Sequence, residues 1–184
     1  MLLGRVTPSL LQQWEEYVIA YFDKAKMAET DKVSSVLTCW RDTEIDNFIK
    51  MNKECFCAAD FTFTKFMANI RKCFLDPLWQ NNIMCNIVNS RMDSKESFSS
   101  FTNCVIAGNN LLDGTDIHLN AAALQKLLVA NMSEYLASKL DHLRGTEHEH
   151  LDSLVSFKEW MAEVVMIDHE LCVNLKCLRA ILIF

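Results

Sequence analysis

Chain breakers are scarce in this sequence, and their scarcity constrains the fold more than any other feature. The 184 residues include only 4 glycines and 2 prolines. A sheet-rich fold of this length needs many tight turns, and such turns depend on Gly, Pro or Asn-Gly pairs. With 51% hydrophobic residues, the chain has enough apolar material to bury a core. We therefore predict an all-α protein whose helices are joined by short polar loops.

Apolar residues recur at three- and four-residue spacing, a pattern typical of helices with one buried face. Thr7 and Pro8 predict the start of the first helix, because threonine is a common N-cap and proline fits the first helical position. Two short helices are predicted at 31–39 and 43–52. A stronger helix follows a predicted cap at Asp60. Its apolar stripe consists of Phe63, Phe66, Met67, Ile70 and Phe74.

The Asp76-Pro77 step marks a predicted domain boundary. A residue before proline is pushed out of the helical conformation, so the preceding helix ends here. We predict two small helical lobes, an amino-terminal one of residues 1–76 and a carboxy-terminal one of residues 77–184. Each lobe is expected to have a core of its own.

Capping signals organise the second lobe after a predicted helix over 78–92. Asp93 with Glu96 has the form of a capping box and predicts a helix that contains Gly108. A glycine inside a helix costs about 1 kcal/mol relative to alanine, and a close contact between helices would explain it. Three further helices are predicted from their N-caps: Asn120 caps a helix over 121–130, Ser133 caps the next one, and Ser156, paired with Glu159, caps the last. A polar loop around Gly145 is predicted before this last helix.

The eight cysteines have no spacing that indicates a disulfide framework. Four of them lie singly in apolar stretches, where a free thiol behaves as a small hydrophobic residue. These are Cys39, Cys73, Cys85 and Cys104.

A zinc site is not predicted either, because such sites need two close pairs of ligands. Cys55 and Cys57 are too close together, and Cys172 and Cys177 have no second pair nearby. The histidines at 142–150 lie around a polar loop. The sequence contains no nucleophile elbow, glycine-rich phosphate loop or aspartic-protease triplet. We therefore predict no catalytic, cofactor-binding or metal-binding residue, no cofactor and no enzymatic activity.

Charge argues against nucleic acid as a direct partner. Residues 1–76 contain 10 Lys and Arg against 11 Asp and Glu, and residues 77–184 contain 8 against 13, so both halves are acidic. Affinity for RNA usually comes from a basic surface that releases counterions from phosphates. We expect weak RNA binding. The small basic strip of Lys65, Arg71 and Lys72 is interpreted as a surface face.

No targeting or membrane segment is predicted. The amino-terminal residues lack the apolar stretch of a secretory signal. The apolar run at 177–184 is far shorter than the ~20 residues that span a bilayer. Together with the scattered thiols, these features predict a cytoplasmic protein with reduced cysteines.

Two segments resemble the Gag capsid protein of Gypsy-type LTR retrotransposons. The segment FTFTKFMANIRKCFLDPLWQ is similar to the helix that closes the amino-terminal lobe of Gag, although the family often has tryptophan in place of Phe63. Its matching residues are Phe63, Phe66, Arg71, Phe74 and Leu75. The segment DSKESFSSFTNCVIAGNNLLDGTDIHLN resembles the next part of Gag. Its matching residues are Asp93, Phe98, Phe101, Asn109, Asn110, Leu111, Leu112, Gly114, Thr115, His118 and Leu119.

The segments ALQKLLVANMSEYLASKL and SFKEWMAEVVMID follow in the order expected of the carboxy-terminal Gag lobe. The resemblance implies a two-lobed capsid-like fold. It also implies a structural protein that self-associates into oligomers or shells, with RNA packaged in the full element. A zinc knuckle and a basic tail are absent from this sequence, so RNA packaging is not expected of this polypeptide alone.

The resemblance places self-association in the carboxy-terminal lobe, where residues 173–184 are apolar. In the alternative interpretation, Leu175, Leu178, Ile181 and Ile183 cover their own lobe. A rival function is a monomeric intracellular adaptor derived from a Gag gene. An enzyme with unrecognised chemistry is the third possibility.

Overall fold

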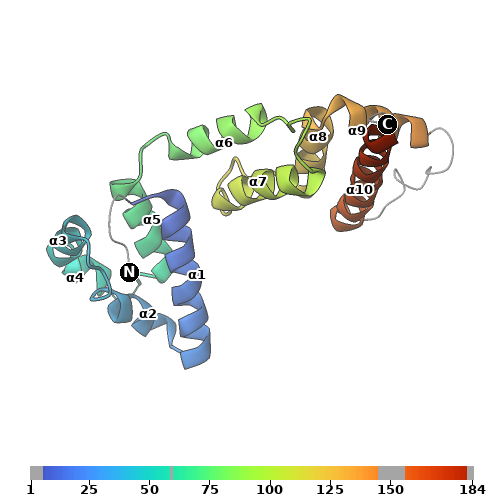
Figure 1. Cartoon of the computed structure of the whole chain (residues 1–184). Helices are drawn as coiled ribbons and strands as arrows, with labels where there is room; N and C mark the ends of the chain where they lie inside the picture. Colours follow the sequence, from blue (N-terminus) through green and yellow to red (C-terminus); the bar gives the residue numbers. More distant parts are fainter. Residues whose placement is uncertain (1–5, 59, 145–155, 182–184) are drawn as a thin grey trace. The chain divides into compact units, whose positions relative to one another are not determined.

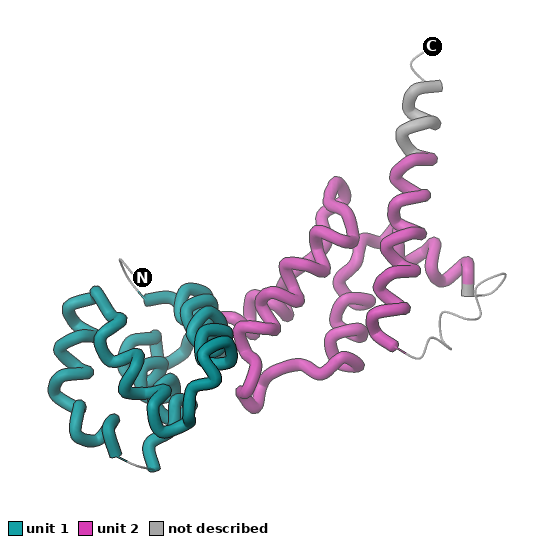
Figure 2. The backbone as a smooth tube through the Cα atoms, turned by 90° about the horizontal axis from the view of Figure 1, so that it is seen from below, with its two compact units in different colours: residues 1–80 teal, residues 81–184 magenta. Residues whose placement is uncertain are grey.

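The computed structural model describes residues 6–58, 60–144 and 156–181, and their side chains as far as Asn174 with the exception of Arg144. In this part of the chain every regular element is a helix and no strand is found, which confirms the all-α prediction (Figure 1). The chain divides into two compact units, residues 1–80 and 81–184, which Figure 2 colours separately. The division falls after Gln80, whereas the sequence placed the boundary after Asp76.

Unit 1 begins with the helix that the sequence predicted. The Thr7 hydroxyl accepts a hydrogen bond from the Leu10 N–H at 3.3 Å, and Pro8 occupies the first helical position. This helix ends at Lys26, which adopts the left-handed conformation with φ of 50°. The helices of the unit are α1 (Pro8–Ala25), α2 (Glu29–Val36), α3 (Thr43–Met51), α4 (Lys53–Phe56) and α5 (Phe63–Phe74).

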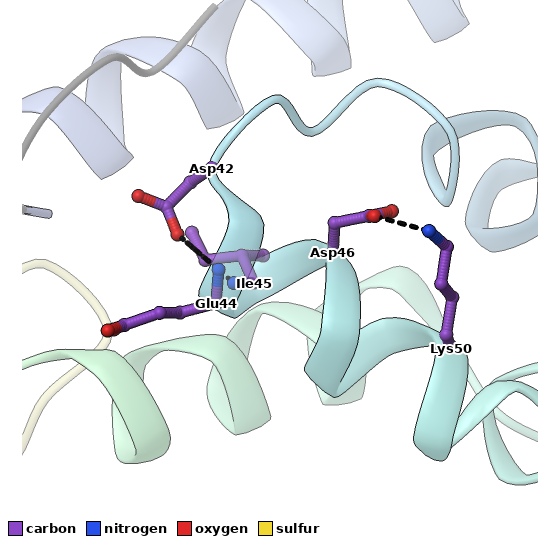
Figure 3. A network of polar contacts seen from close by, with 5 residues as sticks. All are labelled: Asp42, Glu44, Ile45, Asp46 and Lys50. Atoms are coloured by element: carbon purple, nitrogen blue, oxygen red, sulfur yellow. Dashed lines mark hydrogen bonds and ion pairs between the residues drawn. The ribbon is translucent and has the colours of Figure 1, made fainter.

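The N-terminus of α3 shows how local hydrogen bonds fix a short helix (Figure 3). The Asp42 carboxylate accepts from the N–H groups of Glu44 and Ile45, at 2.9 and 3.1 Å. One turn further on, Lys50 pairs with Asp46 at i,i+4 spacing. The short helix α4 follows directly and was not predicted.

The predicted cap of α5 is wrong by two residues. Thr62, not Asp60, is the N-cap, and its hydroxyl accepts from the Lys65 N–H at 3.3 Å. Asp60 lies in a turn closed by a hydrogen bond from the Phe61 N–H to the Ala58 carbonyl, so its side chain precedes the helix.

The core of unit 1 is rich in aromatic rings. The rings of Trp14 and Trp40 lie 4.2 Å apart between centroids, and Phe22 meets Phe63 edge to face at 5.0 Å. Phe66 is fully buried among these helices, as its position on the predicted apolar stripe requires. The buried cluster comprises Leu11, Phe22, Val33, Val36, Leu37, Trp40, Ile45, Ile49, Phe56, Phe63, Phe66, Met67, Ile70 and Leu75.

Unit 2 is built around its last and longest helix, which contacts the three helices before it. Two predicted caps are confirmed here: Asn120 accepts from the Ala123 N–H at 2.9 Å, and Ser133 accepts from the Leu136 N–H at 3.4 Å. The Ser156 hydroxyl accepts from the Glu159 N–H at 3.2 Å, as predicted. The helices are α6 (Trp79–Asn89), which starts at the end of unit 1, α7 (Phe98–Leu111), α8 (Ala121–Asn131), α9 (Glu134–Arg144) and α10 (Phe157–Ile181). The predicted polar loop around Gly145 lies outside the described residues.

The predicted capping box at the start of α7 is also wrong. Ser97 is the N-cap and accepts from the Ser100 N–H at 3.2 Å. The carboxylates of Asp93 and Glu96 instead accept from the N–H groups of Lys95 and Asp93, at 2.9 and 3.4 Å. These two acids therefore close a turn that precedes the helix.

The glycine inside α7 is explained by a close contact between helices. A Cβ atom at Gly108 would lie 3.0 Å from Cγ1 and 3.3 Å from Cδ1 of Ile87 on α6. Such an approach is tighter than ordinary van der Waals contact, so α6 and α7 meet here because residue 108 has no side chain. A close helix contact, which the sequence analysis named as the feature that would explain this glycine, is therefore present.

Three buried polar side chains connect distant segments of unit 2. Asp168 on α10 accepts from the Phe98 N–H at the start of α7, at 2.9 Å. Asn131 at the end of α8 donates to the Val88 carbonyl of α6 at 3.3 Å. Asn109 on α7 holds the loop that follows it, since its amide accepts from the Leu119 N–H and donates to the Leu119 carbonyl, both at 2.9 Å. Each satisfies backbone groups outside its own helix, and for Asp168 and Asn131 the partners are 70 and 43 residues away in sequence.

Candidate self-association surfaces

Helix α10 carries two different faces. Trp160, Val164 and Leu171 lie on the buried face, together with Ile167, and are at most 7% exposed. At 3.6 residues per turn, Met166 and Val173 fall on the opposite side of the helix. They are 54% and 45% exposed. Ala162 and His169 lie on the same outward side and are exposed as well. We call Ala162, Met166, His169 and Val173 the outward face of α10.

The outward face is a surface that the sequence analysis did not identify. An exposed apolar side chain is common by itself, but aligned ones on a single helix face mark a candidate contact surface. The signal was available, because Met166 and Val173 are seven residues apart and thus share a face. It was missed because the buried apolar residues alone were enough to predict a helix here.

The predicted contact surface at residues 173–184 is described only in part. Val173 belongs to the outward face. The side chains of Leu175, Leu178 and Ile181, and all of Ile183, lie outside the described residues. Whether they cover their own lobe or another chain stays a prediction.

Unit 1 has a comparable stripe on α1. Leu10, Tyr17 and Tyr21 share one face of the helix by their spacing. They are 40%, 77% and 57% exposed, respectively. Other residues of α1 turn inward instead: Leu11 is fully buried and Trp14 packs against the aromatic core. Each unit thus presents at least one exposed apolar helix face.

The α5 residues on which the sequence resemblance to Gag rested are used mainly to build the core. Phe63 and Phe66 are buried, as predicted, and Leu75 is buried at the helix end. Phe74 is only partly buried and packs against the same cluster. Aromatic rings in these positions stabilise the unit, so they are not free to stack on nucleic-acid bases.

The basic strip on α5 is partly neutralised within the unit. Arg71 forms an ion pair with Glu15 of α1, and the Lys65 ammonium donates to the Asp60 carbonyl at 2.9 Å. Burial raises the pKa of Glu15 above its ordinary value of 4.5, although the neighbouring Arg71 opposes the rise. The strip is a surface face, as the sequence analysis interpreted it.

The Gag-like residues of α7 and its following loop form a hydrogen-bonded turn. Leu112 is fully buried, and its carbonyl accepts from the Thr115 hydroxyl at 2.6 Å. Gly114 adopts φ of 72°, a conformation that favours glycine. Nε2 of His118 lies 3.0 Å from the side-chain amide nitrogen of Asn109. The two hydrogen bonds to the Leu119 backbone fix which end of that amide is nitrogen. Because an amide nitrogen only donates, Nε2 of His118 is the acceptor.

The expectation that the scattered cysteines act as small buried hydrophobic residues is wrong. Cys39 lies in the loop after α2, and Cys73, Cys85 and Cys104 lie on the exposed sides of their helices. In the part of the chain that the structure describes, one cysteine is half-buried, Cys172. The exposed ones are Cys39, Cys55, Cys57, Cys73, Cys85 and Cys104.

No grouping of three or more His, Cys, Asp or Glu side chains that could hold a metal ion occurs among the described residues. Over the same residues, no helix is both long and apolar enough to cross a membrane. No family model, curated protein or solved structure matches this chain.

Proposed function

We propose that the chain is a self-associating structural protein of the Gag capsid type and has no catalytic role. The observation that carries the proposal is the outward face of α10, where Met166 and Val173 are exposed on a helix whose other face is buried. Two small helical units in one chain, and Gag-like motifs in the expected order, support the same proposal.

Assembly of this kind needs only modest contacts. Symmetric association repeats the same interface many times, so each contact can be weaker than that of a stable dimer. Such an interface can bury less than the roughly 1,200 Å² of a standard complex. A short apolar helix face flanked by polar residues is suited to that role.

The proposed partner is therefore a second copy of this chain, in the cytoplasm, and not RNA. Residues 1–80 have 10 basic against 11 acidic side chains, and residues 81–184 have 8 against 13. Neither unit has the basic excess that drives counterion release. Binding to generic RNA should be weak at physiological salt, and tight binding with a steep salt dependence would contradict this part of the proposal.

Sedimentation velocity over a range of protein concentrations tests the main proposal. The wild-type chain should shift to larger species as concentration rises, and Met166→Glu should shift it back to monomer. Met51→Glu is the matched control, because Met51 is 85% exposed on α3 of the other unit. Circular dichroism should show unchanged helix content in both variants.

Two outcomes would overturn the proposal. A wild-type chain that stays monomeric at high concentration would favour a monomeric adaptor. Equal effects of Met166→Glu and Met51→Glu would show that association is not located on α10. A variant that lacks residues 173–184 tests the role of the tail. If it loses association and keeps its helicity, the tail belongs to the interface. If it unfolds, the tail belongs to the core.

A further inference from the structure

A pocket lies between α6 and α7 within unit 2, and the proposed function does not use it. It has a volume of about 300 Å³ and is partly open to solvent. One face of α6, together with Ser90 directly after it, forms one wall, and one face of α7, at residues 104–111, forms the other. A volume near 300 Å³ is at the small end of the range for ligand sites in proteins.

The floor of the pocket is already formed. Ile87 and Val105 line it and are only 4% and 2% exposed, so they are held by the core of the unit. The contact between Ile87 and Gly108 fixes the approach of the two helices beside the pocket. Because the helices already touch there, they cannot move closer to close the pocket without a clash.

The lining determines the chemistry of an occupant. It contains no Asp, Glu, Lys, Arg or His side chain. A charged ligand would lose hydration here without gaining a partner, which is unfavourable. Asn86 on α6 and Ser90 directly after that helix are the polar groups on that side, and Cys104 places an exposed thiol on the α7 side. An apolar floor with hydrogen-bonding groups along one edge suits a neutral molecule with one polar end.

We propose that this pocket binds a small neutral amphiphile. Its hydrocarbon part lies on Ile87 and Val105, and its hydroxyl group meets Asn86 and Ser90. An apolar cavity of about 150 Å³ holds benzene, so a volume twice as large accommodates roughly ten to twelve non-hydrogen atoms. A medium-chain alcohol has this size and chemistry.

The test uses 1-octanol with the full chain. Modification of individual cysteines by N-ethylmaleimide is followed by peptide mass spectrometry while 1-octanol is titrated. Octanol should slow the modification of Cys104 severalfold and in a saturable way. Cys85, which is exposed on α6 but does not line the pocket, should be unaffected. Octanoate and octylammonium should bind at least about tenfold more weakly, because each has a charge that the lining cannot pair.

A matched pair of variants locates the binding. Cys104→Leu places extra volume in the pocket and should weaken octanol binding, measured by calorimetry, by roughly tenfold. Cys85→Leu adds the same side chain outside the pocket and should leave binding unchanged. The proposal is overturned if neither protection nor heat saturates, or if both variants lose binding equally. It is also overturned if Cys104 is protected by raising the protein concentration and not by octanol, since a second copy of the chain would then cover the pocket.

Discussion

The two units hold their helices together by different means. In unit 1 the core is rich in aromatic rings that contact one another, with Phe66 flanked by Phe56 at 5.2 Å and Trp40 at 6.2 Å between centroids. In unit 2 aromatic contacts are concentrated around Phe98 and Trp160, which meet edge to face at 6.0 Å. There, the buried side chains of Asn109, Asn131 and Asp168 bind backbone groups outside their own helices.

Because of this difference, each unit should be destabilised by a different kind of substitution. Ring packing depends on volume and shape, because dispersion and hydrophobic burial fall when a void is left. A buried hydrogen bond depends on polarity at nearly constant volume, because an unpaired donor or acceptor remains costly in the interior. Unit 1 should therefore respond to lost volume, and unit 2 to lost polarity.

The largest effect is expected from Phe66→Ala in unit 1. Phe66 is fully buried, so its removal leaves a large void and should lower the free energy of unfolding by about 3–5 kcal/mol. That loss is a large part of the stability of a small domain. Hydrogen exchange followed by mass spectrometry should show faster exchange in peptides of α1, α2 and α5 than in those of α7 to α10.

Two controls sharpen this prediction. Phe66→Leu retains most of the volume and should cost less than Phe66→Ala. Tyr17→Ala removes an aromatic ring that is 77% exposed and should change stability by no more than about 0.5 kcal/mol. If Phe66→Ala and Phe66→Leu were equally destabilising, volume would not be the property that matters in unit 1.

Asp168→Ala should give the next largest effect, located in unit 2. The carboxylate accepts from the Phe98 N–H at 2.9 Å and lies at the N-terminus of α7, where negative charge is favourable. Loss of this acceptor should cost about 1.5–3 kcal/mol. Asp168→Asn keeps an acceptor oxygen of the same size and should recover part of the loss. Equal losses in both variants would show that charge, and not the hydrogen bond, connects α10 to α7.

Asn109→Ala should have a smaller effect, confined to the loop after α7. Its amide makes two hydrogen bonds with the backbone of Leu119 and one with His118. Because His118 is exposed, water can replace part of these bonds, and we expect a loss of about 1–2 kcal/mol. Faster hydrogen exchange at 112–120 is the specific readout, with the exposed Asn103→Ala on the same helix as control. If hydrogen exchange in this loop were unchanged, the hydrogen bonds of Asn109 would not contribute to the stability of unit 2.

The features of the fold that were predictable from the sequence are those set by neighbouring residues. The caps at Thr7, Asn120 and Ser133 were predicted correctly, since a cap binds backbone only three residues away. The caps assigned to Asp60 and Asp93 were wrong because a second candidate, Thr62 or Ser97, lies just downstream. Local sequence alone does not decide between two adjacent capping residues, because the packing of the helix selects one.

The contacts that distinguish unit 2 could not be predicted, because their partners lie far away in sequence. Asp168 and Phe98 are 70 residues apart, and no local sequence pattern pairs them. The outward face of α10 was missed for a related reason. The spacing of apolar residues predicts which face of a helix is buried, but whether the opposite face is exposed depends on which other helices cover it. Gly108 was the exception, because a glycine inside a helix is itself a signal of close contact.

The smallest expected effect concerns the ion pair between Glu15 of α1 and Arg71 of α5, and it tests whether polarity matters in unit 1 at all. Glu15 is 18% exposed in its side chain and pairs with Arg71, yet burial raises its pKa. A carboxyl group with a raised pKa binds its proton more tightly in the folded state than in the unfolded one. Its contribution to stability therefore falls as pH rises from the ordinary value of 4.5 through the raised folded value.

Glu15→Gln should remove this slope and change stability at neutral pH by no more than about 1 kcal/mol, because partly exposed pairs contribute little. Urea unfolding at several pH values between 4 and 7 gives the measurement, and Glu16→Gln on the same helix is the control. A large loss of stability in Glu15→Gln at neutral pH would mean that unit 1, like unit 2, depends on a specific polar contact.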